Sequence, residues 1–218
     1  MTVRAVCFDV GETLISEERV WTDWAHWLGV PTITFLAELG AVIERRQHHL
    51  GVFDAFRPPG TFDVETERRA LLESGRRVDF DATDLYPDAL DCLRRLKAAG
   101  LRVAVAGNQP PAVSEALFGS CGVELDLVAS SAAWGVEKPS PAFFERLVAE
   151  LGVEPKDVAY VGDRVDNDVL PANAAGMVSV FIRRGPWGYI HADWPEAGQA
   201  AIRIDSLAEL PHALGAAA

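Results

Sequence analysis

The chain has 218 residues, of which 49% are hydrophobic and 24% are charged. This length allows one domain, or one domain with a sizeable insert, and the apolar content excludes a disordered chain. With 20 Lys and Arg against 32 Asp and Glu, the formal net charge is −12. Such a surface repels polyanions, which excludes nucleic acid and an anionic membrane as expected partners. The first residues reach Asp9 too soon to hold the apolar region of a signal peptide, so we expect a cytoplasmic protein.

The first predicted element is a strand over Val3–Phe8, which ends at Asp9. The crossover helix that a parallel sheet requires does not follow it. Instead, residues 17–83 are expected to be mostly helical, because they show no strand pattern of comparable quality. One helix in this segment is predicted from the spacing of Ile33, Leu36, Leu39 and Ile43. Another is predicted over Val64–Ser74, between Pro58-Pro59-Gly60 and Gly75.

From Pro87 onward, short apolar runs alternate with amphipathic helices. Helices are predicted over Asp88–Ala99 and from Ser140, whose hydroxyl is expected to cap the helix, to Gly152. Strands are predicted over Leu101–Ala106, Leu125–Ala129, Val158–Val161, Val178–Ile182 and Ile202–Ile204. This alternation predicts an α/β fold: a doubly wound parallel sheet covered on both faces, formed by residues 1–16 and 84–218 and interrupted by a helical insert, residues 17–83.

Polar side chains follow several of these predicted strands. Asp9, Asn108 and Asp163 come directly after strands, and Lys138 lies in a loop before a helix. Taken singly, each would most often cap a helix or close a turn. Because ligands bind at the carboxyl ends of parallel strands, the four together predict a site at this edge of the sheet.

Four segments in this order resemble the motifs of the haloacid dehalogenase-like (HAD) hydrolase superfamily: residues 8–14, Gly107-Asn108, Lys138-Pro139 and residues 162–168. The resemblance covers the whole chain, since the insert is similar to that family's helical cap. It implies a Rossmann-like core, a hydrolase activity of the phosphatase kind, and a small phosphorylated metabolite as substrate. The ordered set is specific for the superfamily but does not identify the substrate.

The resemblance also implies a role for each motif residue. Asp9 would be the nucleophile that forms an aspartyl-phosphate, and a carboxylate suits this role because it is ionised at neutral pH without a helper base. Thr13 would donate its hydroxyl to Asp9 or shape the turn. Lys138 would neutralise Asp9 and the transferred group. Backbone N–H groups of Gly107 and Asn108 would bind the phosphate.

The implied cofactor is Mg²⁺, which prefers oxygen ligands and keeps several of its waters. Asp9, Asp163 and the backbone carbonyl of Gly11 would bind the ion. Asp168 would orient either the waters of the metal or the ammonium group of Lys138. The ion and the lysine would also supply the local attraction for phosphate that a protein of net charge −12 otherwise lacks.

Two positions depart from the family pattern. Gly11 stands where the phosphatases usually carry a second aspartate that serves as general acid and base, and Gly107 stands where they carry Ser or Thr. Loss of a general acid typically lowers the rate by ~10²–10⁴. Glu12 is adjacent and is a candidate replacement acid, with water as the alternative. A glutamate in a turn is more commonly solvated or bound to local backbone, and we favour that interpretation of Glu12.

Three functions remain open. A Mg²⁺-dependent phosphatase is favoured because of Asp163 and Asp168. A metal-independent haloacid dehalogenase would explain Gly11, since halide leaves without a proton, but that branch usually lacks the acid at Asp163. A metabolite-binding protein with weakened or no catalysis would explain both departures. The substrate and the oligomeric state are not determined by the sequence.

Several further residues are weaker candidates. The insert residues Trp21, Trp24 and Trp27 are interpreted as the insert's own core rather than as an aromatic lid. Residues 45–49, which include two arginines and two histidines, are interpreted as the basic end of a helix, which its dipole favours. Arg164 and the pair Arg183-Arg184 follow strands at the site edge and are candidates for substrate specificity.

Overall fold

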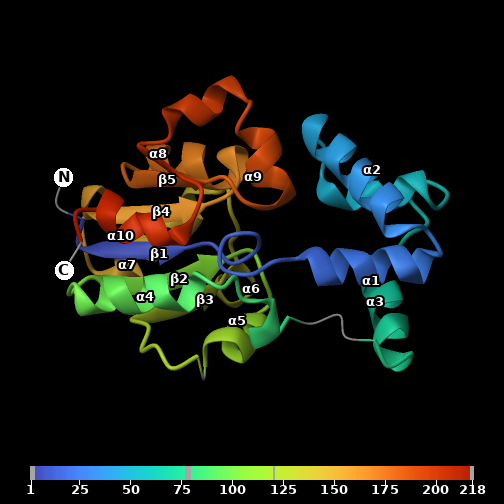
Figure 1. Cartoon of the computed structure of the whole chain (residues 1–218), viewed down its shortest axis with the longest axis horizontal. Coiled ribbons are helices and arrows are strands. Elements are labelled where there is room, and N and C mark those ends of the chain that lie inside the picture. Colours follow the sequence, from blue (N-terminus) through green and yellow to red (C-terminus); the bar gives the residue numbers. More distant parts are fainter. Residues whose placement is uncertain (1–2, 77–79, 120, 217–218) are drawn as a thin grey trace. The chain divides into compact units, whose positions relative to one another are not determined.

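The computed structural model describes residues 3–76, 80–119 and 121–216 (Figure 1). Its chain forms two compact units. The first unit consists of Met1–Ser16 with Asp81–Ala218, and the second consists of Glu17–Phe80.

The first unit is built on one parallel sheet of six strands in the order β3-β2-β1-β4-β5-β6. The strands are β1 (Ala5–Phe8), β2 (Arg102–Gly107), β3 (Leu127–Ser130), β4 (Val158–Gly162), β5 (Val178–Ile182) and β6 (Ile202–Ile204). At the centre, Ala5 of β1 pairs with Arg102 on one side and with Val158 on the other. All six strands therefore correspond to predicted ones, and the doubly wound parallel sheet is confirmed.

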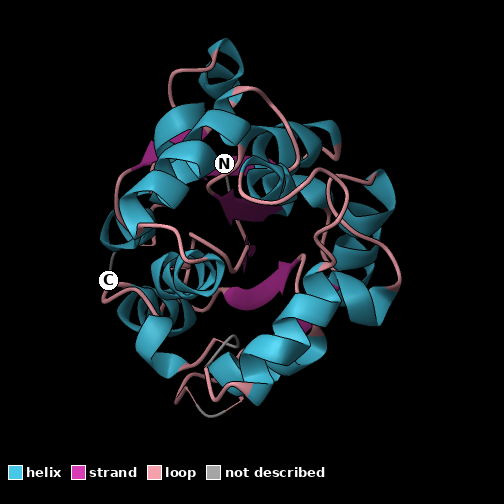
Figure 2. Cartoon of the chain, turned by 90° about the vertical axis from the view of Figure 1, so that its right-hand side faces the viewer, coloured by secondary structure: helices cyan, strands magenta, loops and turns pink. Residues whose placement is uncertain are grey.

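Helices lie on both faces of this sheet (Figure 1), and in the part of the chain that the structure describes the remaining regular structure is helical (Figure 2). In the first unit they are α4 (Ala89–Ala98), α5 (Pro111–Phe118), α6 (Ser131–Trp134), α7 (Pro141–Leu151), α8 (Leu170–Ala174), α9 (Gly185–His191) and α10 (Leu210–Ala213). Helix α7 begins with Pro141, which needs no N–H partner, and ends at Gly152 with φ 61°. The Ser140 side chain makes no capping hydrogen bond, so that expectation was wrong; Pro141 alone marks the start.

One core cluster of the first unit lies between the central strands and α7. Ala5 and Cys7 of β1 pack in one buried cluster with Phe143, Phe144 and Tyr160. The Tyr160 hydroxyl donates to the carbonyl of Ala106 at 2.8 Å, which satisfies its polar end inside this cluster. Because all four residues of β1 are fully buried, the strand that leads to Asp9 is rigidly enclosed.

The second unit is helical, with α1 (Glu18–Leu28), α2 (Thr32–Glu44), a 3₁₀ segment His49–Ala55 and α3 (Val64–Glu73). Aromatic rings form its centre. The ring centroids of Trp24 and Phe53 lie 5.3 Å apart in an edge-on arrangement, and those of the stacked rings of Phe53 and Phe62 lie 3.8 Å apart. The helix predicted from the spacing of Ile33, Leu36, Leu39 and Ile43 is confirmed as α2. Ile33 is nevertheless 80% exposed, whereas Phe35 is buried because it packs among the aromatic rings. Among the described helices, no single one has the length and apolar content to cross a membrane; α1 and α2, bent by 113°, meet that criterion only as a pair.

Residues 81–84 belong to the first unit, although the sequence places the end of the insert at Thr83. Asp81 and Asp84 form a reciprocal capping box. The Ser16 N–H donates to the carbonyl of Asp84 at 2.8 Å, and the Tyr86 N–H donates to the carbonyl of Leu14 at 2.9 Å. These bonds join the chain leaving the first unit to the chain returning to it.

Candidate active site

The predicted nucleophile lies at the carboxyl end of the central strand. The Asp9 N–H donates to the carbonyl of Val161 at 2.9 Å, which fixes the residue beside β4. Its side chain is largely buried, and its Oδ1 lies 2.8 Å from Nζ of Lys138. The Asp9 carboxylate and the Lys138 ammonium group are therefore in contact at the edge of the sheet where the sequence predicts a site.

Lys138 is held from both ends. Its Nζ lies 2.8 Å from Asp9 and 2.5 Å from Asp168, and its side chain is 1% exposed. Its backbone is bound by Asn108, which accepts from the Lys138 N–H and donates to the Lys138 carbonyl, both at 2.9 Å. Burial opposes the charge, but the carboxylates of Asp168 and Asp9 raise the pKa of Lys138 above its usual value. The lysine is therefore charged, and the Asn108 side chain serves to position it.

Asp163, at the end of β4, lies buried beside these carboxylates. Its Oδ2 is enclosed and has no hydrogen-bond partner among the described residues. Single oxygens of Asp9, Asp163 and Asp168 lie within 4.8 Å of one another. Burial and the neighbouring carboxylates Asp168, Asp9 and Glu12 raise the pKa of Asp163 well above its usual value. An enclosed, all-oxygen set with an unpartnered atom and excess negative charge fits a hard divalent cation such as Mg²⁺.

Asp168 uses both carboxylate oxygens within the protein. Oδ1 pairs with Lys138 at 2.5 Å, and Oδ2 accepts from the Arg164 N–H at 3.0 Å. The Cβ of any residue replacing Gly162 would lie 2.3 Å from the Asp168 carboxylate, so this glycine lets the side chain fit against β4. Asp168 was expected to orient either the waters of the metal or the ammonium group of Lys138, and these contacts favour the second role.

The remaining motif residues differ in what they offer. Gly107 leaves space for the nucleophile, because a Cβ there would lie 2.4 Å from Oδ1 of Asp9 and 2.6 Å from Oε1 of Gln109. The Thr13 hydroxyl is buried and has no hydrogen-bond partner among the described residues, so it does not donate to Asp9. The Thr13 backbone instead forms part of the turn, with its N–H 3.3 Å from the carbonyl of Val10.

Glu12 is not the solvated turn residue that we expected. It is 4% exposed, has φ 49°, and accepts a 2.5 Å hydrogen bond from the hydroxyl of Tyr86. Arg184, expected to contribute to specificity, is also turned inward: it donates to the carbonyl of Thr13 at 3.0 Å and pairs with Asp88. Sequence reasoning missed Tyr86, because no local pattern links it to a residue 74 positions earlier.

The other weaker candidates also have internal partners. Arg164 binds Asp166 through two hydrogen bonds of 3.1 and 2.8 Å, and Arg183 binds Asp205 in the same manner at 2.9 and 3.0 Å. In the second unit Trp21 and Trp24 are buried, while Trp27 donates to Glu67 at 2.7 Å.

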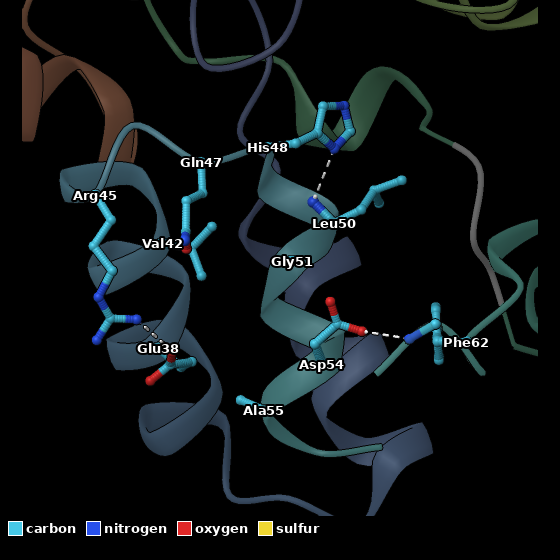
Figure 3. A pocket seen from close by; sticks show the side chains of 11 residues that line it. Glu38, Val42, Arg45, Gln47, His48, Leu50, Gly51, Asp54, Ala55 and Phe62 are labelled. Atoms are coloured by element: carbon cyan, nitrogen blue, oxygen red, sulfur yellow. Dashed lines mark hydrogen bonds and ion pairs between the residues drawn. The ribbon is translucent and has the colours of Figure 1, made fainter. Parts of the chain in front are cut away.

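The second unit contains a hollow of about 690 Å³ between α2 and the 3₁₀ segment His49–Ala55 (Figure 3). Its polar lining is already partly paired. Arg45 lies 3.2 Å from Glu38, and Nδ1 of His48 accepts from the N–H of Leu50 at 3.3 Å. Helix α2 ends at Glu44, so Arg45 follows the helix instead of forming its last turn.

The fold and these residues together define an α/β core in which a buried lysine, Lys138, is paired with Asp9 and Asp168, and in which oxygens of Asp9, Asp163 and Asp168 lie within 4.8 Å of one another. The haloacid dehalogenase-like hydrolase family matches residues 3–176, and the chain belongs to this family of hydrolases. A phosphoglycolate phosphatase of Xylella fastidiosa is 32% identical over 228 residues, which cover 97% of this chain and 91% of that protein. The predicted family and enzyme class are therefore confirmed.

Other relatives match over shorter stretches. A glyceraldehyde 3-phosphate phosphatase of Methanopyrus kandleri is 40% identical over 105 residues, 47% of this chain and 45% of that protein. The chain spans about half the length of this and several similar relatives. Among solved structures, a magnesium-bound HAD-hydrolase of Bacillus subtilis covers 98% of this chain and 99% of its own, with a TM-score of 0.71 at 16% identity. An L-2-haloacid dehalogenase matches over 97% of this chain and 99% of its own, with a TM-score of 0.63 at 21% identity.

Proposed function

We propose that this hydrolase is a Mg²⁺-dependent phosphatase of small phosphorylated metabolites that acts through an aspartyl-phosphate on Asp9. The observation that carries the proposal is the buried triad of Asp9, Lys138 and Asp163, in which the proposed nucleophile is paired with a cation and the second carboxylate, that of Asp163, has an unpartnered oxygen. The relatives named as phosphatases of phosphoglycolate and glyceraldehyde 3-phosphate support a short, phosphorylated acid or aldehyde as substrate.

In the proposed reaction, a carboxylate oxygen of Asp9 attacks phosphorus while the bond from phosphorus to the ester oxygen breaks. Water then cleaves the acyl phosphate, which releases inorganic phosphate and restores the carboxylate. Lys138 holds Asp9 in place and compensates charge on the transferred group, because its ammonium remains protonated between two carboxylates. Backbone N–H groups of Gly107 and Asn108 are proposed to bind the phosphate.

The proposed cation site consists of Asp9, Asp163 and the carbonyl of Gly11, with Asp168 acting through Lys138. When bound, Mg²⁺ would neutralise negative charge on the phosphate and among the carboxylates. The closeness of the Asp9, Asp163 and Asp168 oxygens and the enclosed Oδ2 of Asp163 support a cation here, while the Gly11 carbonyl is implied by the family resemblance. The magnesium-bound relative of the same fold is consistent with it.

Gly11 provides no general acid for the leaving group. The Glu12 carboxylate already accepts from Tyr86, so we propose that water supplies the proton. Aryl and acyl phosphates release stable anions and hardly need this proton, whereas alkyl phosphates do. We also propose that the helical unit Glu17–Phe80 is a cap that selects the substrate, as its similarity to the family's cap implies.

The test compares wild type, Asp9→Asn and Asp163→Asn on phosphoglycolate and on an aryl phosphate, with Mg²⁺ or with EDTA. We expect turnover only in wild type with Mg²⁺, and calorimetry should show weaker Mg²⁺ binding by Asp163→Asn. Asp91→Asn, whose side chain is exposed, is the matched control and should behave as wild type.

Different outcomes would support the alternatives. Turnover of 2-haloacids without metal, and none on phosphates, would identify a dehalogenase. Binding of a phosphorylated metabolite with no turnover of any ester would identify a binding protein. Undiminished phosphatase activity in Asp9→Asn would contradict the proposed nucleophile.

A further inference from the structure

The loop that carries Asp9 contains a residue in an unfavourable backbone conformation. Glu12 has φ 49°, in the left-handed region that side-chain-bearing residues rarely adopt. Such a conformation persists only where the surroundings fix it, and it is common at functional sites. The Glu12 side chain is also almost completely buried, which is unusual for a glutamate. Its contacts must therefore compensate for both.

Two segments distant in sequence hold this side chain. The Tyr86 hydroxyl donates to Oε2 of Glu12 at 2.5 Å. On the turn that begins α9, a Cβ at Gly185 would lie 2.3 Å from the same Oε2, so the carboxylate rests directly on the glycine backbone. Only glycine permits this approach, and its own φ of 61° also favours glycine.

Arg184, next to Gly185, also connects the turn at the start of α9 to the loop that carries Asp9. Arg184 donates from Nη1 to the carbonyl of Thr13 at 3.0 Å, and its guanidinium lies 4.1 Å from the centre of the Tyr86 ring. The turn before α9 therefore contacts the nucleophile loop through both side chain and backbone, and Tyr86 lies between the two. At the other end of the loop, the Asp9 N–H is fixed to Val161.

We propose that Glu12 is a positioning residue whose carboxylate, held by Tyr86 against Gly185, fixes the loop that carries Asp9, and that it is not a substitute proton donor. The role deepens the proposed phosphatase function and rests on it for its kinetic readout. Release of the carboxylate would let the loop relax from its left-handed conformation. A displacement of about 1 Å at a reacting group can lower the rate ~10²-fold.

The kinetic test uses Glu12→Gln, Glu12→Ala and Tyr86→Phe with an aryl phosphate. The glutamine amide oxygen can still accept from Tyr86, so Glu12→Gln should stay within about threefold of wild type. Glu12→Ala and Tyr86→Phe should lose about tenfold to 100-fold in kcat with KM unchanged. Equal losses in Glu12→Gln and Glu12→Ala would overturn the proposal in favour of a proton-transfer or charge role. Full activity in Glu12→Ala would overturn it outright.

A second test does not depend on activity. Gly185→Ala should lower the urea unfolding midpoint because the added Cβ meets the Glu12 carboxylate, and Glu12→Ala combined with Gly185→Ala should lower it by less than the two single changes together. Gly135→Ala, at φ 67° with no atom within 4 Å, measures the backbone effect alone. If the midpoint changes of Glu12→Ala and Gly185→Ala were strictly additive in the double variant, the proposed contact between the two residues would be wrong. If wild type hydrolyses no phosphate, the proposed function fails, whereas these midpoints still decide whether Glu12 is held as described.

Discussion

Replacing Gly107 by serine would restore the hydroxyl that the second motif of this family usually carries, yet we expect it to lower turnover. A Cβ at this position would lie 2.4 Å from Oδ1 of Asp9. To reach even a 3.0 Å contact, the two atoms must separate by about 0.6 Å. The Cβ would also lie 2.6 Å from Oε1 of Gln109, whose amide is held by a 2.7 Å hydrogen bond to Ser114. We therefore expect the added Cβ to displace the Asp9 carboxylate.

A displacement of this size at the attacking oxygen should reduce kcat/KM by about 10- to 100-fold, which corresponds to about 1.4–2.7 kcal/mol in the activation free energy. The assay is steady-state hydrolysis of an aryl phosphate with Mg²⁺. Gly107→Ala should lose as much as Gly107→Ser, because both add the same Cβ. Gly198→Ala is the matched control, since no atom lies within 4 Å of its Cβ.

The reasoning would be refuted if Gly107→Ser matched or exceeded wild type, because the hydroxyl would then fit without displacing Asp9. It would also fail if Gly107→Ala were fully active while the serine variant was not. A double change, Gly107→Ser with Gln109→Ala, should recover part of the loss by opening space beside the added Cβ.

Three further outcomes are expected. Lys138→Met should abolish turnover and lower the free energy of unfolding by about 3–5 kcal/mol in urea titrations, because it leaves two buried carboxylates unpaired. Wild type should hydrolyse aryl phosphates ~10²–10⁴-fold faster than alkyl phosphates, and Gly11→Asp should narrow that ratio in parallel rate measurements. Although burial opposes it, the Arg184 guanidinium and neighbouring donors hold the pKa of Asp88 below its usual value, so this stabilisation exists above about pH 4 and is lost as pH falls. Asp88→Asn should therefore cost about 1–3 kcal/mol in urea unfolding at neutral pH and progressively less toward about pH 3.

The sheet was predictable because most of its strands are apolar runs bounded by turn residues. The short edge strand Ile202–Ile204 instead alternates, with an exposed arginine between two isoleucines. The approach of Lys138 to Asp9 followed from the rule that parallel strands end at one edge. Contacts between distant segments that follow from no such rule could not be predicted. The partner of Glu12 lies 74 residues away, and no local pattern specifies that pair.

The buried side of α2 was not predicted, for a related reason. Ile33 and Phe35 are two positions apart and so lie on nearly opposite sides of the helix, and the aromatic neighbours of Phe35 are what bury its side. Likewise, the binding of the Asn108 amide to the backbone of Lys138 depends on how two loops meet. Sequence pattern therefore identified which residues gather at the site, while their individual tasks depended on tertiary contacts.

The central place of β1 has a consequence for how the chain folds. Ala5 pairs with Arg102 and with Val158, so both neighbours of this strand are far from it in the sequence. Such distant pairings make folding slow and leave an apolar strand exposed meanwhile. The second unit, by contrast, is contiguous from Glu17 to Phe80 and can form from local contacts. Pulse-labelled hydrogen exchange should therefore find α1 and α2 protected before β1, the strand that leads to Asp9.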